Sequence, residues 1–284
     1  MKKSQIQFNW IFVIVAGAII LAFFINFGMK YIELQNKKLG VEVARGIENE
    51  LDNLKTVQLY TELPLGINTK IEFNCDNFKV NDYASKGLSD KIIASDKVIE
   101  TKDLLLWTQE VYMPFKIGNI FYVADAKRKY IFVYDSNSFE FVKGLEIPEI
   151  FNIEKTDEEA GNAIYFTDSD DGVVIKGREK GIVKVNGKEY PYFNLPMLYA
   201  AIFSSDYECI LDKVIEKTGE MAELYGNKAL YIKQQGCSYI GIKSTLDKLR
   251  DAVRKRDYGK ISDLTEQIGQ QNKELYNKGC IPVF

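Results

Sequence analysis

The histidine and cysteine content limits the kinds of catalysis and metal binding that this chain could perform. The 284 residues include no histidine, which excludes histidine acid–base catalysis, Ser-His-Asp and Cys-His nucleophiles, and histidine metal sites. The cysteines are Cys75, Cys209, Cys237 and Cys280, and none forms a C-x-x-C motif, which excludes zinc ribbons and thioredoxin-like redox motifs. An even number of dispersed cysteines predicts two disulfides in an oxidising compartment; four buried free thiols are the alternative.

Clustered carboxylates are the second candidate for chemistry. Asp168, Asp170 and Asp171 lie close together, but an EF-hand loop needs glycine at its sixth position, and Gly172 is fifth counted from Asp168. We interpret the three as a solvated hairpin tip, since aspartate and glycine are ordinary turn residues. No catalytic residue, cofactor or metal site is predicted. A pair of carboxylates of the glycosidase type is the one enzyme chemistry left open.

Two further clusters have structural interpretations. Trp107, Tyr112 and Met113 could face a ligand groove, but aromatic residues are the usual filling of a sheet face, so we expect a core. A basic cluster could bind phosphate or an acidic lipid surface, but cations also complement a helix C-terminus, and neighbouring aspartates dilute them. Its members are Arg250, Arg254, Lys255 and Arg256.

The overall composition describes a folded protein that does not bind nucleic acid. Hydrophobic residues make up 46% of the chain, which is too many for a disordered linker, and aromatic residues make up 13%, which favours a β-rich core. The net charge of −3 and the pI near 5.4 argue against nucleic acid as a partner.

The elements that carry these groups follow an apolar stretch at residues 8–29, which reads FNWIFVIVAGAIILAFFINFGM. It has no charged residue and would span roughly 33 Å as a helix, which matches the hydrocarbon core of a bilayer. Trp10 and Tyr31 lie near its ends, where such rings favour the interface. We predict a short tail at residues 1–7 and a single transmembrane helix at residues 8–29, with the lipid bilayer as partner.

The orientation of this helix rests on the cysteines. Lysines and arginines are more numerous after the helix than before it, so the positive-inside rule does not favour a cytoplasmic tail, but long domains translocate despite such charges. Two disulfides place the C-terminal part outside the cytoplasm. A cleaved signal peptide is the competing interpretation; it would need a small-residue site after the apolar run, whereas Ala16-Gly17-Ala18 lies in its middle.

The first 50 or so residues resemble type IV pilin-like proteins with a class III signal, archaeal ones especially. Lys3-Ser4-Gln5-Ile6 stands directly before the apolar helix, as in that family. The resemblance implies cleavage between Ser4 and Gln5 and a membrane helix that forms part of a filament core. The family prefers glycine or alanine where this chain has Ser4, and the early acidic residue of many bacterial pilins is missing. A generic signal anchor is the alternative.

A helical stalk is predicted at residues 30–60. Apolar residues recur on one face of it, namely Ile32, Leu39, Val43, Ile47, Leu51 and Leu54. This stripe is expected to pack on the protein's own globular part; a neighbouring subunit is the alternative. Ala18 and Ala22 form a small-xxx-small pair that would let a second membrane helix approach, so self-association through this helix, or contact with other envelope proteins, is a further expectation.

Residues 61–204 read as strands separated by turns. Asn186-Gly187 predicts a two-residue hairpin, and Asp170-Asp171-Gly172 predicts another. Because no amphipathic helix separates the strands, we predict antiparallel pairing rather than βαβ units.

Residues 205–284 read as three helices packed on this domain. If they run up, down and up, Cys237 and Cys280 lie at the same end. Cys209 near the start of the first helix would be roughly 30 Å from Cys237, too far for a disulfide. The predicted pairs are therefore Cys237 with Cys280 and Cys75 with Cys209.

The predicted fold is α+β: a membrane helix with a stalk, an antiparallel β-rich domain and a three-helix segment. The predicted function is a structural or interaction role in the cell envelope for a single-pass membrane protein with its C-terminal domain outside the cytoplasm. No catalytic activity is inferred. A pilin-like filament subunit and a membrane-tethered enzyme that uses carboxylates are the alternatives.

Overall fold

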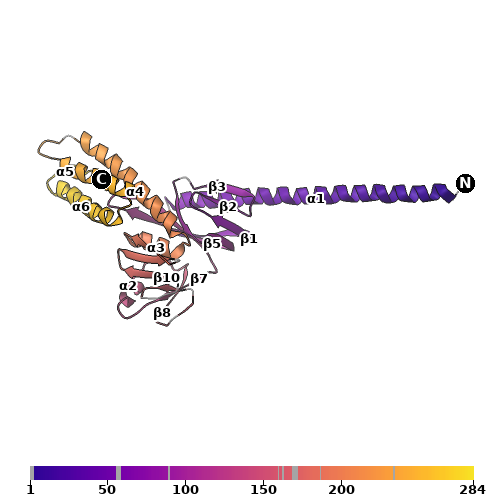
Figure 1. The fold of residues 1–284 in the computed structure, drawn as a ribbon, viewed down its shortest axis with the longest axis horizontal. Helices are drawn as coiled ribbons and strands as arrows, with labels where there is room; N and C mark the ends of the chain where they lie inside the picture. Colours follow the sequence, from indigo (N-terminus) through magenta and orange to yellow (C-terminus); the bar gives the residue numbers. More distant parts are fainter. Residues whose placement is uncertain are drawn as a thin grey trace.

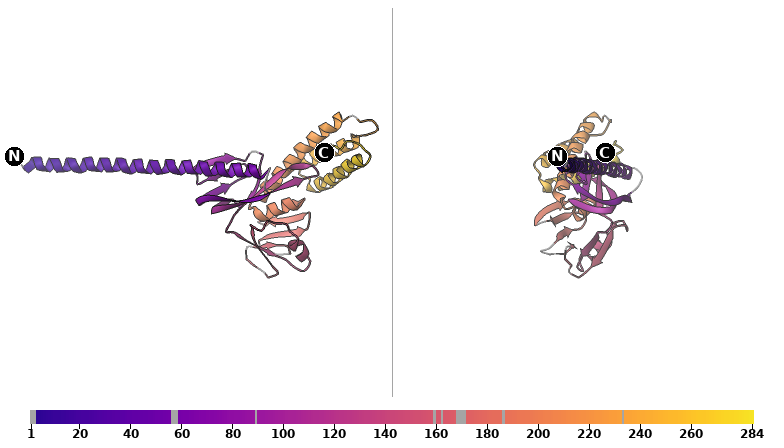
Figure 2. Two further views of the ribbon diagram at one scale, coloured as in Figure 1. Left: turned by 180° about the vertical axis from the view of Figure 1, so that it is seen from behind. Right: turned by 90° about the vertical axis from the view of Figure 1, so that its right-hand side faces the viewer.

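The structure is a computed structural model that describes residues 3–55, 59–88, 90–158, 160–161, 163–167, 172–185, 187–232 and 234–284. A long N-terminal helix leads into two six-stranded sheets and a group of C-terminal helices, so the fold is α+β (Figure 1). Helix α1 (Lys3–Leu54) has 52 residues and is about 78 Å long. Its N-terminal half projects from the folded part as a rod (Figure 2).

The first sheet lies directly under the C-terminal part of α1. Its strand order is β3-β2-β1-β5-β6-β4. Ala44, Ile47, Leu51 and Leu54 of α1 are buried against one face of this sheet. The strands are β1 (Tyr60–Phe73), β2 (Asn77–Val80), β3 (Ala84–Gly87), β4 (Ile92–Ser95), β5 (Val98–Tyr112) and β6 (Lys116–Asp125).

A buried helix joins the first sheet to the second. Helix α3 (Leu195–Phe203) contacts β4, β5 and β6 of the first sheet and β11 and β12 of the second, and its residues from Met197 on are all buried. The second sheet has the order β12-β11-β10-β9-β7-β8. Its strands are β7 (Lys129–Val133), β8 (Asn152–Thr156), β9 (Ile164–Tyr165), β10 (Val173–Gly177), β11 (Gly181–Val185) and β12 (Lys188–Tyr192).

The C-terminal helices form the end of the molecule farthest from the N-terminus (Figures 1 and 2). Helix α4 (Tyr207–Tyr231) packs on α5 (Ile240–Arg254), and α5 packs on α6 (Tyr258–Asn277). The first of them also contacts β4 and β6, so it lies on the first sheet opposite α1. The predicted three helices are thus present, and their turns lie at alternating ends.

The prediction of antiparallel pairing throughout is wrong. Strand β4 pairs with β6 in parallel, and so do β7 with β8, β7 with β9, and β9 with β10. The parallel pair β7–β8 is connected through α2 (Phe139–Lys143), a helix of only five residues. So short a helix leaves no periodic apolar pattern in the sequence, and the crossover connection is therefore not recognisable there.

One predicted hairpin is wrong and one is present. Gly172 has φ +72°, and Val173 N donates to Ala163 O at 3.3 Å, so the chain returns to the start of β9 and β10 runs parallel to it. Strands β11 and β12 form the other hairpin, with Val185 opposite Lys188 and Gly187 at φ +77°. Asn186 lies outside the described residues.

Two predicted boundaries also shift. The stalk expected to reach residue 60 ends at Leu54, and β1 begins at Tyr60. The β-rich segment expected to run to residue 204 ends in α3, a helix that is apolar on all sides. A helix buried all round shows no amphipathic stripe, so its periodicity does not distinguish it from a buried strand.

Candidate functional site

The N-terminal half of α1 is the largest unpartnered feature of the described structure. From Trp10 to Leu34, the large apolar side chains that the structure describes are between 51% and 73% exposed. The side chain of Ile11 is not among them. Soluble monomers rarely expose contiguous apolar patches of more than a few hundred Å². This half of the helix is long and apolar enough to cross a membrane.

Gly40 marks the point where α1 enters the folded part. It is buried, and a Cβ atom there would lie 3.4 Å from Val80 O and 3.5 Å from the Cβ of Tyr83. From this residue on, Ile47 and Leu51 are buried, whereas Ile32 of the predicted stripe is 61% exposed. The expectation that the stripe packs on the protein's own domain is therefore confirmed for the residues after Gly40. It is wrong for Ile32, which precedes the part of the helix that the first sheet covers.

Ion pairs hold the flanks of this helix to the first sheet. Glu48 accepts from Lys86 at 2.7 Å, and Asp52 pairs with Lys91 at 3.1 Å. Lys55, just past the helix, pairs with Asp90 at 3.1 Å and helps to hold the pKa of that carboxyl below its usual value, against the effect of burial. These ion pairs therefore attach the C-terminal part of α1 to the folded domain.

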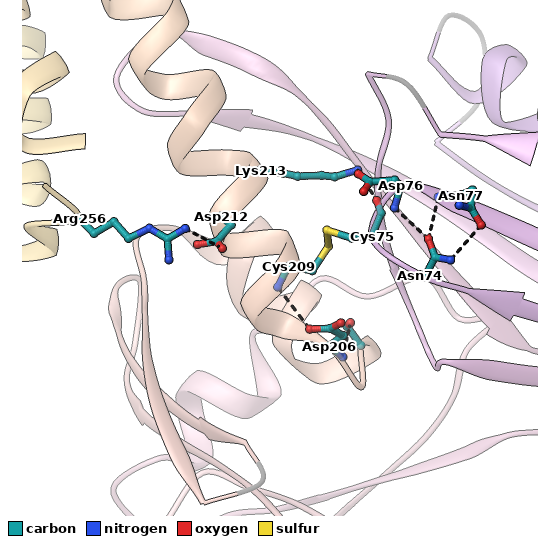
Figure 3. Close-up of a disulfide and its surroundings, with 10 residues drawn as sticks. Asn74, Cys75, Asp76, Asn77, Asp206, Cys209, Asp212, Lys213 and Arg256 are labelled. Atoms are coloured by element: carbon teal, nitrogen blue, oxygen red, sulfur yellow. Dashed lines mark hydrogen bonds and ion pairs between the residues drawn. A yellow bond between two sulfur atoms is a disulfide. The ribbon is translucent and has the colours of Figure 1, made fainter. Parts of the chain in front are cut away.

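The disulfide between Cys75 and Cys209 joins the first sheet to α4, as the sequence predicts (Figure 3). Their Cα atoms are 5.7 Å apart, within the range of an unstrained bridge. Asp206 caps α4 by accepting from Cys209 N at 3.3 Å. Lys213, one turn along α4, donates to Cys75 O and lies 3.5 Å from Asp76 (Figure 3).

The second disulfide joins Cys237 to Cys280, again the predicted pair, with the Cα atoms 5.9 Å apart. It connects the segment between α4 and α5 to the chain just past α6. Gln234 donates to Gly279 O at 3.0 Å and accepts from Ile281 N at 2.7 Å, so the same two segments are also joined by hydrogen bonds. This bridge closes the outer end of the helical segment.

Trp107 and Met113 are core residues. Each is 3% exposed, and the Trp107 ring lies 4.4 Å from that of Tyr122 and 5.1 Å from that of Tyr199. Tyr112, by contrast, is 52% exposed. The core interpretation is confirmed for Trp107 and Met113 and wrong for Tyr112.

A cavity of 470 Å³ beside Trp107 holds a candidate acid pair. Among the described residues, the charged side chains of its lining are Glu110 and Glu146. Glu110 pairs with Lys116 and accepts from the Tyr112 hydroxyl at 2.5 Å, and both interactions lower the pKa of its carboxyl. A general acid in a carboxylate pair needs a raised pKa. Among the described residues, every carboxyl whose pKa is shifted is shifted downward.

The predicted processing site lies at the start of α1. Ser4 and Gln5 are in the first turns of α1, far from the folded part (Figure 1). Asp168, Asp170 and Asp171 fall outside the described residues. In the described part of the chain, no three His, Cys, Asp or Glu side chains gather as a metal site would require.

The basic cluster at the end of α5 is partly neutralised by α4. Arg256 pairs with Asp212 at 3.0 Å (Figure 3), and Arg250 lies 4.0 Å from Glu223. These contacts favour the solvated-face interpretation over a phosphate site.

The chain was compared with models of protein families, with characterised proteins and with solved structures, and none of the three comparisons finds a match.

Proposed function

We propose that the protein is anchored in a membrane by the N-terminal half of α1 and carries its folded part outside the cytoplasm, in a structural or interaction role. The observation that carries this proposal is the change of environment along one continuous helix. From Trp10 to Leu34 apolar side chains are exposed on all sides, and from Gly40 to Leu54 one face is buried. Lipid would cover the exposed apolar side chains of the first part, while the first sheet covers the buried face of the second part. The two disulfides favour the extracytoplasmic side.

Membrane anchoring and orientation are tested together. Alkaline carbonate extraction of membranes should leave the full chain in the pellet, whereas a cleaved signal peptide would leave a shortened chain in the soluble fraction. Protease added to intact cells should digest the folded part if it lies outside. Protection of that part in intact cells, with digestion only after lysis, would contradict the orientation.

A pilin-like filament subunit is the second candidate. Two observations favour it: the Lys3-Ser4-Gln5-Ile6 segment before the apolar run, and a helix whose N-terminal half is bare while its C-terminal half covers a sheet. Mass spectrometry of the mature N-terminus distinguishes this candidate from a generic anchor. A chain that starts at Gln5 supports the pilin-like proposal, whereas an intact Met1, or loss of Met1 alone, argues against it.

The tethered-enzyme alternative receives the least support. The carboxylates that line the cavity beside Trp107 are Glu110 and Glu146, and Glu110 is already paired with Lys116. Hydrolysis of glycans by purified protein, abolished by Glu146→Gln, would restore this alternative.

A further inference from the structure

Helix α1 has a domain side, against which the first sheet packs. Gly40, Ala44, Ile47, Leu51 and Leu54 are the buried residues of this side. At about 100° per residue, the small pair of residues 18 and 22 falls on the same side of the helix. Ala18 and Ala22, which would let a second helix come close, therefore lie on the side of α1 that packs against the first sheet further along the helix.

A second helix that packs in parallel on Ala18 and Ala22 would collide with that folded part. Packed helices have their axes about 8–10 Å apart. From Gly40 upward, the first sheet already occupies this side of α1 at contact distance. A second helix that stays nearly parallel to α1 beyond this pair would therefore meet the first sheet, which makes the small-residue pair a poor site for parallel self-association.

The opposite side of α1, which we call the outer face, is exposed from Ile20 to Arg45. Ile20, Phe24, Phe27 and Tyr31 lie about 180° from the domain side in the apolar half. Their side chains are between 55% and 62% exposed. In Figure 1 and in the left view of Figure 2, no other element drawn as a helix or strand extends along this half of the helix.

Above the apolar half, the outer face carries charges of alternating sign. Lys38, Glu42 and Arg45 are exposed and follow one another at about one-turn intervals on that face. Within the described residues none of the three takes part in an ion pair, whereas Glu48 and Asp52 on the flanks pair with the first sheet. A parallel second helix shifted by one turn would bring its Glu42 level with Lys38 or Arg45 of the first.

We infer that the outer face of α1 binds the outer face of a second copy of this chain, in parallel and offset by about one helical turn. The apolar residues pack within the bilayer, and the charges pair just above it. The domains then point away from the contact, so they do not collide. The inference rests on the proposed membrane anchoring, because that anchoring makes the copies parallel.

Cross-linking of the full chain in membranes tests this contact. Tyr31→Cys places a thiol on the outer face, and Glu33→Cys, two residues on and also exposed, places one on the domain side. With a short bismaleimide, Tyr31→Cys should give several times more covalent dimer than Glu33→Cys. Equal yields, no dimer from either variant, or more dimer from Glu33→Cys would overturn the inference.

Charge reversal tests the pairing. In the Tyr31→Cys background, Glu42→Arg should lower the dimer yield about fivefold, the factor for about 1 kcal/mol of lost ion pairing. Adding Lys38→Glu and Arg45→Glu should restore the yield. Glu33→Arg makes the same charge change on the domain side and should have no effect. A yield unchanged by Glu42→Arg would overturn the assigned contact.

Carbonate extraction of the same samples separates the two proposals. If the chain is released from the membrane, the proposed anchoring fails. If it stays in the pellet and Tyr31→Cys gives no excess of dimer, the anchoring stands and the contact between copies fails.

Discussion

At the scale of single residues, tyrosines are the titratable groups buried in the core. Tyr122 donates to Pro196 O at 2.8 Å, and Tyr207 donates to Pro191 O at 3.0 Å, so each buried hydroxyl has a partner. Burial raises the pKa of Tyr130 and of Tyr199 to about 12. The ionised form of these rings is therefore disfavoured in the folded state.

Stability should fall in strong alkali because of these tyrosines. Below about pH 10 both the folded and the unfolded chain hold the protons, and the stability is complete. As the pH rises from about 10 toward about 12, the unfolded chain alone loses them, so each of Tyr130 and Tyr199 lowers the free energy of unfolding by about 1.4 kcal/mol per pH unit. Urea unfolding at several pH values measures this.

Tyr130→Phe provides the matched variant, because it removes one titrating hydroxyl and keeps the ring. The decline of its stability between about pH 10 and 12 should be less steep than that of the parent chain. A denaturation midpoint of the parent that stays constant across this range would contradict the prediction.

At the scale of elements, the C-terminal helices show how glycine allows close packing. Within α4, Gly219 lies against Val253 of α5, and a Cβ atom at Gly219 would be 2.8 Å from its Cγ1. Two turns further along α4, a Cβ atom at Gly226 would be no closer than 3.9 Å to Asp247 or Leu246 of the same partner helix. One glycine is required by the contact and the other is not.

Alanine substitutions should therefore have opposite effects at these two glycines. Gly219→Ala should overpack the contact with Val253 and lower the free energy of unfolding by about 1–3 kcal/mol. Gly226→Ala should leave it unchanged or raise it by up to about 1 kcal/mol, since alanine favours the helix. Thermal and urea unfolding of both variants compare them directly. A Gly219→Ala chain as stable as the Gly226→Ala chain would contradict the α4–α5 contact.

The disulfides join elements distant in sequence, and their removal should be costly. Cys75 and Cys209 are 134 residues apart, and Cys237 and Cys280 are 43 apart. In the chain-entropy model the bridges are worth about 5 and about 4 kcal/mol, respectively, and measured losses are commonly about 2–5 kcal/mol. Paired Cys→Ser variants should unfold at lower urea concentrations. Peptide mapping without reductant checks the pairs; a linked 209–237 peptide would contradict the fold.

At the scale of the whole molecule, the protein is a bare rod attached to a folded body, in which the core under α1 is separate from the main core. Helix α3 lies between the two sheets, and its Phe203 contacts Trp107 and Tyr122 of the first sheet and Tyr130 of the second. The rod contributes to this body only from Gly40 onward. The body and the rod should therefore be separable.

Deletion of residues 1–29 should release a soluble, folded protein. The buried face of α1 from Gly40 to Leu54 remains in that fragment, so the core of the first sheet is intact. Near-ultraviolet circular dichroism and a cooperative unfolding transition would show a native core. If the fragment aggregates while the full chain is stable in detergent, the division into rod and body is wrong.

Much of the local structure could be predicted from the sequence. The apolar run from residue 8, the hairpin around Gly187 and the stripe through Ile47 and Leu51 are patterns of neighbouring residues, which local geometry is enough to interpret. The cysteine pairs followed from helix lengths and the alternation of three helices. These features depend on spacing along the chain, and spacing is what a sequence contains.

Tertiary structure alone decided the rest. Helix α3 and the parallel strands around β7 are held by contacts between segments that are distant along the chain. No local sequence pattern therefore predicts them. The side of α1 that the first sheet covers is such a long-range contact as well. Only that contact shows that Ala18 and Ala22 lie under the domain while Lys38, Glu42 and Arg45 face outward. Periodicity defines the faces of a helix, but packing against the rest of the chain determines which of them remains open to a partner.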